Sequence, residues 1–142
     1  MNKKFKEELG IFIIILLFIS FFVFHLNDES DLWWDSSVYI GMGKYIYSFG
    51  DAGLWEDSRP LVWPLLLGFF WRLGLDTIFF GKLMLLLFGV GMIYLTYLIA
   101  CDLFGKKTAL VSSFLLSFSP TFFLFNSVMF TEIPSTFFLL LG

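Results

Sequence analysis

One stretch of the chain carries the side chains best suited to chemistry. Seven of the 12 acidic residues lie between Asn27 and Pro60. Within this stretch Asp35 and Tyr39 are four residues apart, so on a helix they share one face. A carboxylate placed there could take a proton from an acceptor hydroxyl. The competing interpretation is an N-cap, because an aspartate at a helix start accepts hydrogen bonds from first-turn amides for about 1 kcal/mol.

Two further charged residues could complete such a site. Arg59 directly precedes Pro60, and its planar fork of donors suits either a phosphate or an interfacial position at a membrane. Glu132 opens an apolar segment, where it either stabilises the helix start or faces Asp35 as a second acid. The two carboxylates would then hold a divalent cation, Mg²⁺ or Mn²⁺, through oxygen ligands. The other acids of the loop are expected to be solvated.

The composition indicates a membrane protein. Hydrophobic residues make up 58% of the 142 positions and charged residues 15%, and 21 residues are phenylalanine. Soluble domains are roughly 45–50% apolar and about 25% charged. Lipid must therefore be the solvent for much of this surface, which favours an all-α polytopic fold in the plasma membrane. No basic patch points to nucleic acid, and the single Cys101 excludes an intrachain disulfide.

The apolar runs predict the elements that position the site. We expect membrane spans over 10–26, 78–101 and 108–125, an external loop over 27–59 that contains an interfacial helix over 35–49, a short helix over 60–75, and the start of a further span over 133–142. Lysines at the N-terminus place that end in the cytoplasm and the loop outside. The sequence does not decide whether the segment 60–75 crosses the membrane. The last run is about half a span long, so we expect the N-terminal part of a longer protein, inactive alone.

Finer expectations concern individual side chains. The interfacial helix should bury one face, with Ser36 lying elsewhere. That face consists of Val38, Met42, Tyr45, Ile46 and Phe49. Lys82, near one end of its span, should reach the membrane surface with its ammonium group. A polar loop is expected over 102–107.

The order of three motifs resembles a known family. They are WWDSSVYIGMGKYI, SRPLVWPLLLGFFWRLGL and the segment from LFGKKTALVSSF to TEIPSTFFLLLG. Together they resemble the N-terminal half-module of GT-C membrane glycosyltransferases, in the superfamily of protein O-mannosyltransferases and aminoarabinose transferases. The resemblance begins at Trp33 and implies an amphipathic juxtamembrane helix in the first external loop.

The resemblance also implies an activity and roles for residues. Such enzymes move a sugar from a polyprenyl- or dolichyl-phosphate to an acceptor hydroxyl of a protein, lipid or glycan on the external face, here with inversion. By position, Asp35 matches the catalytic acid, with Ser36 where a second acid often stands. Arg59 matches the residue that binds the lipid phosphate, and Glu132 matches a later acid that precedes a proline.

Two other function classes are compatible with the residues alone. In a fragment of a multispan transporter or flippase, Asp35 and Glu132 would be ordinary interfacial acids. In a non-catalytic membrane subunit, the apolar helices would serve to pack against a partner.

Overall fold

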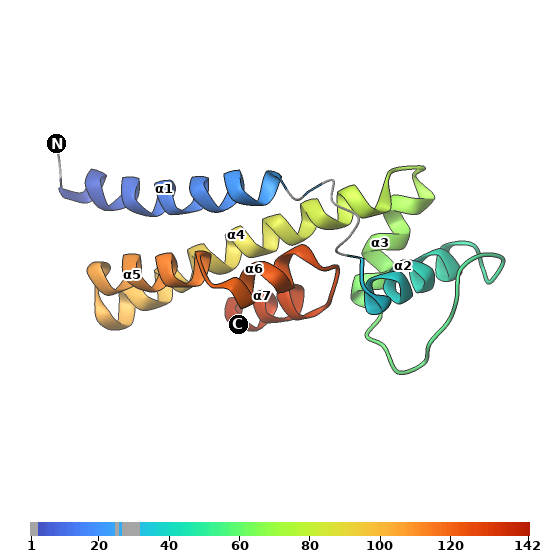
Figure 1. The fold of residues 1–142 in the computed structure, drawn as a ribbon. Helices are drawn as coiled ribbons and strands as arrows, with labels where there is room; N and C mark the ends of the chain where they lie inside the picture. The colour runs from blue at the N-terminus through green and yellow to red at the C-terminus, as the bar shows by residue number, and fades with distance from the viewer. Residues whose placement is uncertain (1–2, 25, 27–31) are drawn as a thin grey trace.

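The computed structural model describes residues 3–24, 26 and 32–142, and within this part all regular structure is helical, without strands (Figure 1). The helices are α1 Lys3–Val23, α2 Trp34–Tyr47, α3 Val62–Arg72, α4 Thr77–Phe104, α5 Lys106–Ser117, α6 Pro120–Ser127 and α7 Glu132–Leu141. The all-α class predicted from composition is confirmed. Three acids of the loop, Asp28, Glu29 and Asp31, lie outside the described residues, as does His25.

Helix α4 is the element against which most of the others pack. It contacts α1, α3, α5, α6 and α7. Its N-terminus is capped by Asp76, whose carboxylate accepts hydrogen bonds from the amides of Ile78 at 2.9 Å and Phe79 at 3.1 Å. Helices α2 and α3 lie at one end of the bundle, and the turn between α4 and α5 lies at the other (Figure 1). With 28 residues, α4 separates these ends by about 42 Å.

The span predicted over 108–125 is broken. Within the described residues, α4 alone is long and apolar enough to cross a bilayer as a single helix. Helices α5 and α6 meet that criterion only together, and they are bent by 56° where they join. Pro120 cannot continue the helix before it because it lacks an amide hydrogen. It starts α6 instead, where Ser119 accepts a hydrogen bond from the amide of Phe122 at 3.4 Å.

The prediction of a polar loop over 102–107 is wrong. Asp102 lies within α4, and Gly105 alone separates α4 from α5. Gly105 has a φ of 84°, a conformation open to glycine because it has no Cβ. One residue therefore reverses the chain where a loop of six was expected.

Helix α3 is shorter than the predicted segment of 60–75. It starts at Val62, with Pro64 in its first turn, where the missing amide hydrogen leaves no helical bond unmade. It ends at Arg72, and Gly74 follows with a φ of 73°, the left-handed conformation that commonly stops a helix.

Helices α2 and α3 touch through glycines. A Cβ added to Gly43 would lie 2.6 Å from the amide nitrogen of Gly68 and 2.6 Å from the carbonyl oxygen of Pro64. Such distances mean that backbone packs directly on backbone, with no room for a side chain. The close approach holds α2 firmly against α3.

The buried face of α2 differs from the prediction at three positions, one of which is Tyr45, which is 37% exposed. Val38 and Met42 are buried as expected. Phe49 is 94% exposed, because α2 ends at Tyr47 and Phe49 adopts a φ of 58° in the turn that follows. Ser36 was expected on another face but is completely buried, because the approach to α3 covers that side of the helix.

Lys82 also departs from the prediction. It is completely buried rather than extended to the membrane surface. The preceding residue, Gly81, faces the side chains of Leu67 and Met129, so this turn of α4 is enclosed by neighbouring elements. A buried ammonium needs a partner, and Lys82 has one.

Replacing Gly43 by alanine should destabilise the protein by about 1–3 kcal/mol, because the new methyl group would meet backbone atoms that cannot rotate away. The measurement is the midpoint of thermal unfolding in detergent. Gly10→Ala is the matched control, since its methyl group would meet only the mobile end of the Leu110 side chain at 3.0 Å. Equal midpoints for both variants would contradict the backbone contact.

Candidate active site

Arg59 lies at the centre of a polar cluster at the α2–α3 end of the bundle. Its Nη2 donates to Oδ1 of Asp35 at 2.5 Å, and its Nε donates to Oε1 of Glu56 at 3.2 Å. Nη1 donates to the Tyr39 hydroxyl at 3.5 Å, and the guanidinium carbon lies 5.5 Å from the centre of the Tyr39 ring. The Arg59 side chain is 24% exposed and that of Asp35 is 37% exposed. The cluster is therefore held in place yet open to solvent.

Helix α2 positions two of these side chains. Asp35 is in its first turn and Tyr39 follows one turn later. The prediction that Asp35 caps α2 is wrong, because Trp33 is the N-cap residue and no side chain caps this end. The Asp35 carboxylate binds Arg59 instead.

The loop after α2 brings Arg59 back to Asp35. The amide of Leu54 donates to the carbonyl of Gly41 at 3.2 Å, which ties the loop to the middle of α2. Gly53, with a φ of 89°, packs so closely that an added Cβ would lie 2.8 Å from the amide nitrogen of Tyr45. The loop thus wraps around α2, and its last residues reach the face that carries Asp35.

The cluster stabilises the positive charge of Arg59. Hydrogen bonds to Asp35 and then to Tyr39 raise the pKa of the Arg59 guanidinium further above its ordinary value, with a smaller contribution from Glu56. Arginine is always protonated in proteins, so the guanidinium is a permanent cation. It carries five N–H donors, and three nitrogens already donate to protein atoms. The remaining donors could bind an oxyanion at the open side.

The structure brings together three of the four predicted site residues, namely Asp35, Tyr39 and Arg59. Glu132 is exposed at the start of α7, and it has no hydrogen bond or ion pair with the other three in the part of the chain described. Glu132 nevertheless lies at the end of the bundle where the Arg59 cluster lies. The Trp33 ring lies 5.8 Å from that of Phe130, two residues before Glu132.

Glu56 was not predicted to belong to the site, and the burial of Ser36 was not predicted either. Glu56 was counted among the solvated acids, although its place three residues before Arg59 could have indicated the pair that they form. Ser36, next to Asp35, has a buried hydroxyl without a hydrogen-bond partner. Its burial depends on the approach of α3, so nothing local in the sequence points to it.

A metal ion between Asp35 and Glu132 stays a prediction. Among the described residues, no group of three or more His, Cys, Asp or Glu side chains could hold one. The Asp35 carboxylate already accepts from the Arg59 cation, which would repel a divalent ion in the same place. The Asp35 and Glu132 carboxylates, as they stand, therefore do not fit a metal ion.

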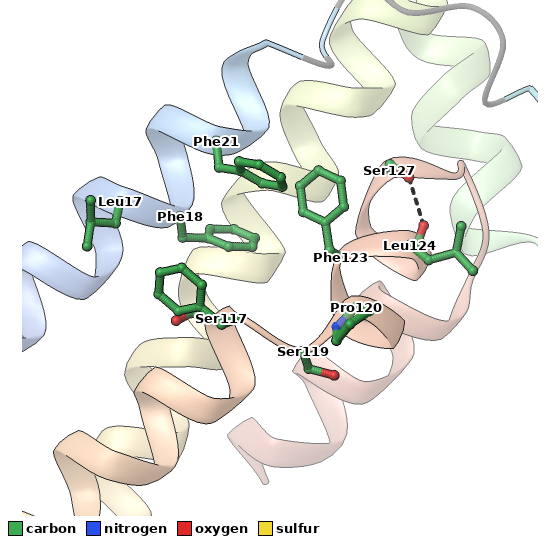
Figure 2. Close-up of a pocket in the computed structure, with 10 residues that line it drawn as sticks. Leu17, Phe18, Phe21, Ser117, Ser119, Pro120, Phe123, Leu124 and Ser127 are labelled. Carbon is green, nitrogen blue, oxygen red and sulfur yellow. Dashed lines mark hydrogen bonds between the residues drawn. The ribbon is translucent and has the colours of Figure 1, made fainter.

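An apolar cavity of about 520 Å³ lies between α1 and the break between α5 and α6 (Figure 2). It shares no lining residue with the Arg59 cluster. Phenylalanine side chains dominate its walls, with serine hydroxyls at the helix break. The lining includes Phe18, Phe21, Phe123, Ser117 and Ser119.

The comparison with family models identifies the chain as part of a glycosyltransferase of GT-C type. A sequence model of the dolichyl-phosphate-mannose-protein mannosyltransferase family matches residues 58–142, which is more than half of the chain, and the chain belongs to this family. The match includes Arg59 and Glu132 but begins after Asp35 and Tyr39. No curated protein and no solved structure matches the chain.

Proposed function

We propose that the protein transfers a sugar from a polyprenyl- or dolichyl-phosphate donor to an acceptor hydroxyl at the external membrane face. The observation that carries this proposal is the 2.5 Å contact between the Asp35 carboxylate and the Arg59 guanidinium at an open surface. This contact supports the proposal because the transfer needs both a carboxylate and a cation at one site. Membership of a glycosyltransferase family favours this activity over a transporter or a packing subunit.

The chemistry is a single displacement. The acceptor hydroxyl attacks the anomeric carbon while Asp35 takes its proton, and the bond from that carbon to the phosphate oxygen breaks. The departing lipid phosphate gains negative charge, which Arg59 stabilises through its N–H donors. Attack from the side opposite the leaving group inverts the anomeric configuration.

The apolar cavity supports a donor carried by a lipid. Its phenylalanine-rich lining suits a branched hydrocarbon chain, because burial of apolar surface is favourable and does not depend on direction. We assign the isoprenoid chain of the donor to this cavity. The phosphate would then lie toward the α2–α3 end, where α1 and the α6–α7 connection both lead (Figure 1).

The donor and the stereochemistry can be tested with the complete protein in isolated membranes. We expect transfer from polyprenyl-phosphate mannose and none from a nucleotide-activated mannose. Nuclear magnetic resonance of the product should show the opposite anomeric configuration to the donor. Retained configuration would rule out the single displacement, and activity with the nucleotide sugar alone would rule out the lipid donor.

We propose a multi-pass topology with the N-terminus in the cytoplasm and the loop after α2 outside. To test it, a cysteine at Asp51, which is exposed, would be labelled in intact cells after Cys101 is replaced by serine. A membrane-impermeant maleimide should label it without permeabilisation. Labelling only after permeabilisation would place the Arg59 cluster in the cytoplasm.

Tyr39→Phe should raise the KM for the lipid donor several-fold and leave kcat nearly unchanged. The variant keeps the ring beneath Arg59 but loses the hydroxyl that accepts from Nη1, so the cation is held less precisely. Steady-state kinetics with varied donor concentration would measure this. Tyr39→Leu removes both contacts and should raise KM further; equal values for the two variants would mean that the ring contributes nothing.

A further inference from the structure

A second cavity lies on the opposite side of α2 from the Arg59 cluster. It has a volume of about 570 Å³, and its lining includes Ser37 and Lys44 of α2, Trp71 of α3 and Ile78 of α4. At about 100° per residue, Ser37 and Lys44 lie roughly 180° around the helix from Asp35. The two sites are therefore separated by α2 itself.

Three side chains of this cavity carry hydrogen-bond donors. They are the Lys44 ammonium, the Ser37 hydroxyl and the Trp71 indole N–H. Within the described part of the chain, none of these donors has a hydrogen-bond or ion-pair partner. Lys44 and Trp71 are also half-buried, so part of their hydration is already lost. Donors gathered in this way favour an anionic ligand.

The backbone beside Lys44 is fixed by close packing. A Cβ added to Gly53 would lie 3.0 Å from the Cβ of Lys44. The neighbouring Ala52 amide donates to the Ser48 hydroxyl at 2.9 Å. The wall of the cavity is thus held in place before any ligand arrives, which lowers the cost of binding.

Lys44 has a simpler role as well. It lies in the last turn of α2, where a cation interacts favourably with the carbonyl end of the helix dipole. That role explains a lysine at this position but requires no cavity. It does not account for Trp71, which comes from a different helix and is half-buried.

We propose that this cavity binds a phosphate group, supplied in the membrane by a phospholipid headgroup. Lys44 and Ser37 would bind the phosphate oxygens, and Trp71 suits the headgroup level of a bilayer. Ile40 and Ile78 also line the cavity and would contact the apolar part of the lipid. The inference uses the membrane setting of the family and is independent of the proposed sugar transfer.

The test is a binding titration of the complete protein, purified in neutral detergent, with fluorescent phosphatidylglycerol. We expect saturable binding that Lys44→Gln weakens about tenfold, because a charge-assisted hydrogen bond is lost. Lys44→Arg should restore most of the affinity. Trp71→Phe, which keeps an aromatic ring but removes the indole N–H, should have a smaller effect. Thermal unfolding of each variant checks that the fold is retained.

One matched variant and one competitor complete the experiment. Lys107→Gln removes an exposed lysine of α5 and should bind the lipid as the wild type does. Equal weakening by this variant, or wild-type binding by Lys44→Gln, would overturn the proposal. Competition by inorganic phosphate supports a phosphate site. Lys44-dependent binding of inorganic phosphate without the lipid would assign the same site to soluble phosphate.

Discussion

Asp35→Asn is expected to lower the rate of sugar transfer by roughly 10²–10⁴-fold, the usual contribution of a general base. Asparagine has nearly the same shape and can still accept a hydrogen bond from Arg59, but it cannot take the proton of the acceptor hydroxyl. Because the ion pair becomes a neutral hydrogen bond, Arg59 is held less firmly and the donor KM should rise several-fold, which is much less than the fall in kcat. Initial rates with a radiolabelled polyprenyl-phosphate sugar, at saturating acceptor, would measure both quantities.

The matched control for this variant is Asp51→Asn. Asp51 is an exposed acid of the same loop, and its side chain has no partner in the described part of the structure. This variant should transfer sugar at the wild-type rate. If Asp35→Asn also kept the wild-type rate, Asp35 would not be the base, and the acid–arginine pair would have a structural role only.

Arg59→Gln is expected to lower kcat by about 10²-fold and to weaken donor binding as well. Removing one donor that stabilises charge in the transition state commonly costs 10²–10³-fold in kcat. The kcat of Arg59→Lys should fall between those of the wild type and Arg59→Gln, because lysine keeps the charge but not the planar fork of donors. The measurements are kcat and KM for the lipid donor in the same membranes.

Arg72→Gln provides the comparison for Arg59. Arg72 is an exposed arginine in the last turn of α3 and lies outside the cluster. The Arg72→Gln variant should have the kcat and the donor KM of the wild type. An equal loss in the two variants would mean that general positive charge near the membrane, rather than the contacts of Arg59, supports transfer.

Much of the fold could be predicted because the information is local. Apolar runs indicate helices wherever they occur, and the family resemblance noted from short motifs is confirmed by the match over 58–142. The neighbouring positions of Asp35 and Tyr39 on α2 also follow from a spacing of four residues. The catalytic and binding roles of these residues stay predictions.

What could not be predicted depends on contacts between distant segments. Asp35 and Arg59 are 24 residues apart, and their pairing depends on a loop that Gly53 allows to wrap tightly around α2. The burial of Lys82 likewise depends on which elements enclose its turn of α4. Helical periodicity describes one helix at a time, so it contains no information about contacts between segments that are far apart in the sequence.

The one-residue reversal at Gly105 has a consequence for biogenesis. Helix α5 begins with two lysines and contains three serines, one of which, Ser113, is buried and donates to the carbonyl of Ile93 on α4 at 3.3 Å. Such a helix is a poor candidate for entering lipid alone, because its polar groups need partners there. Because Gly105 alone joins the two helices, we propose that α4 and α5 enter the membrane together as a helical hairpin.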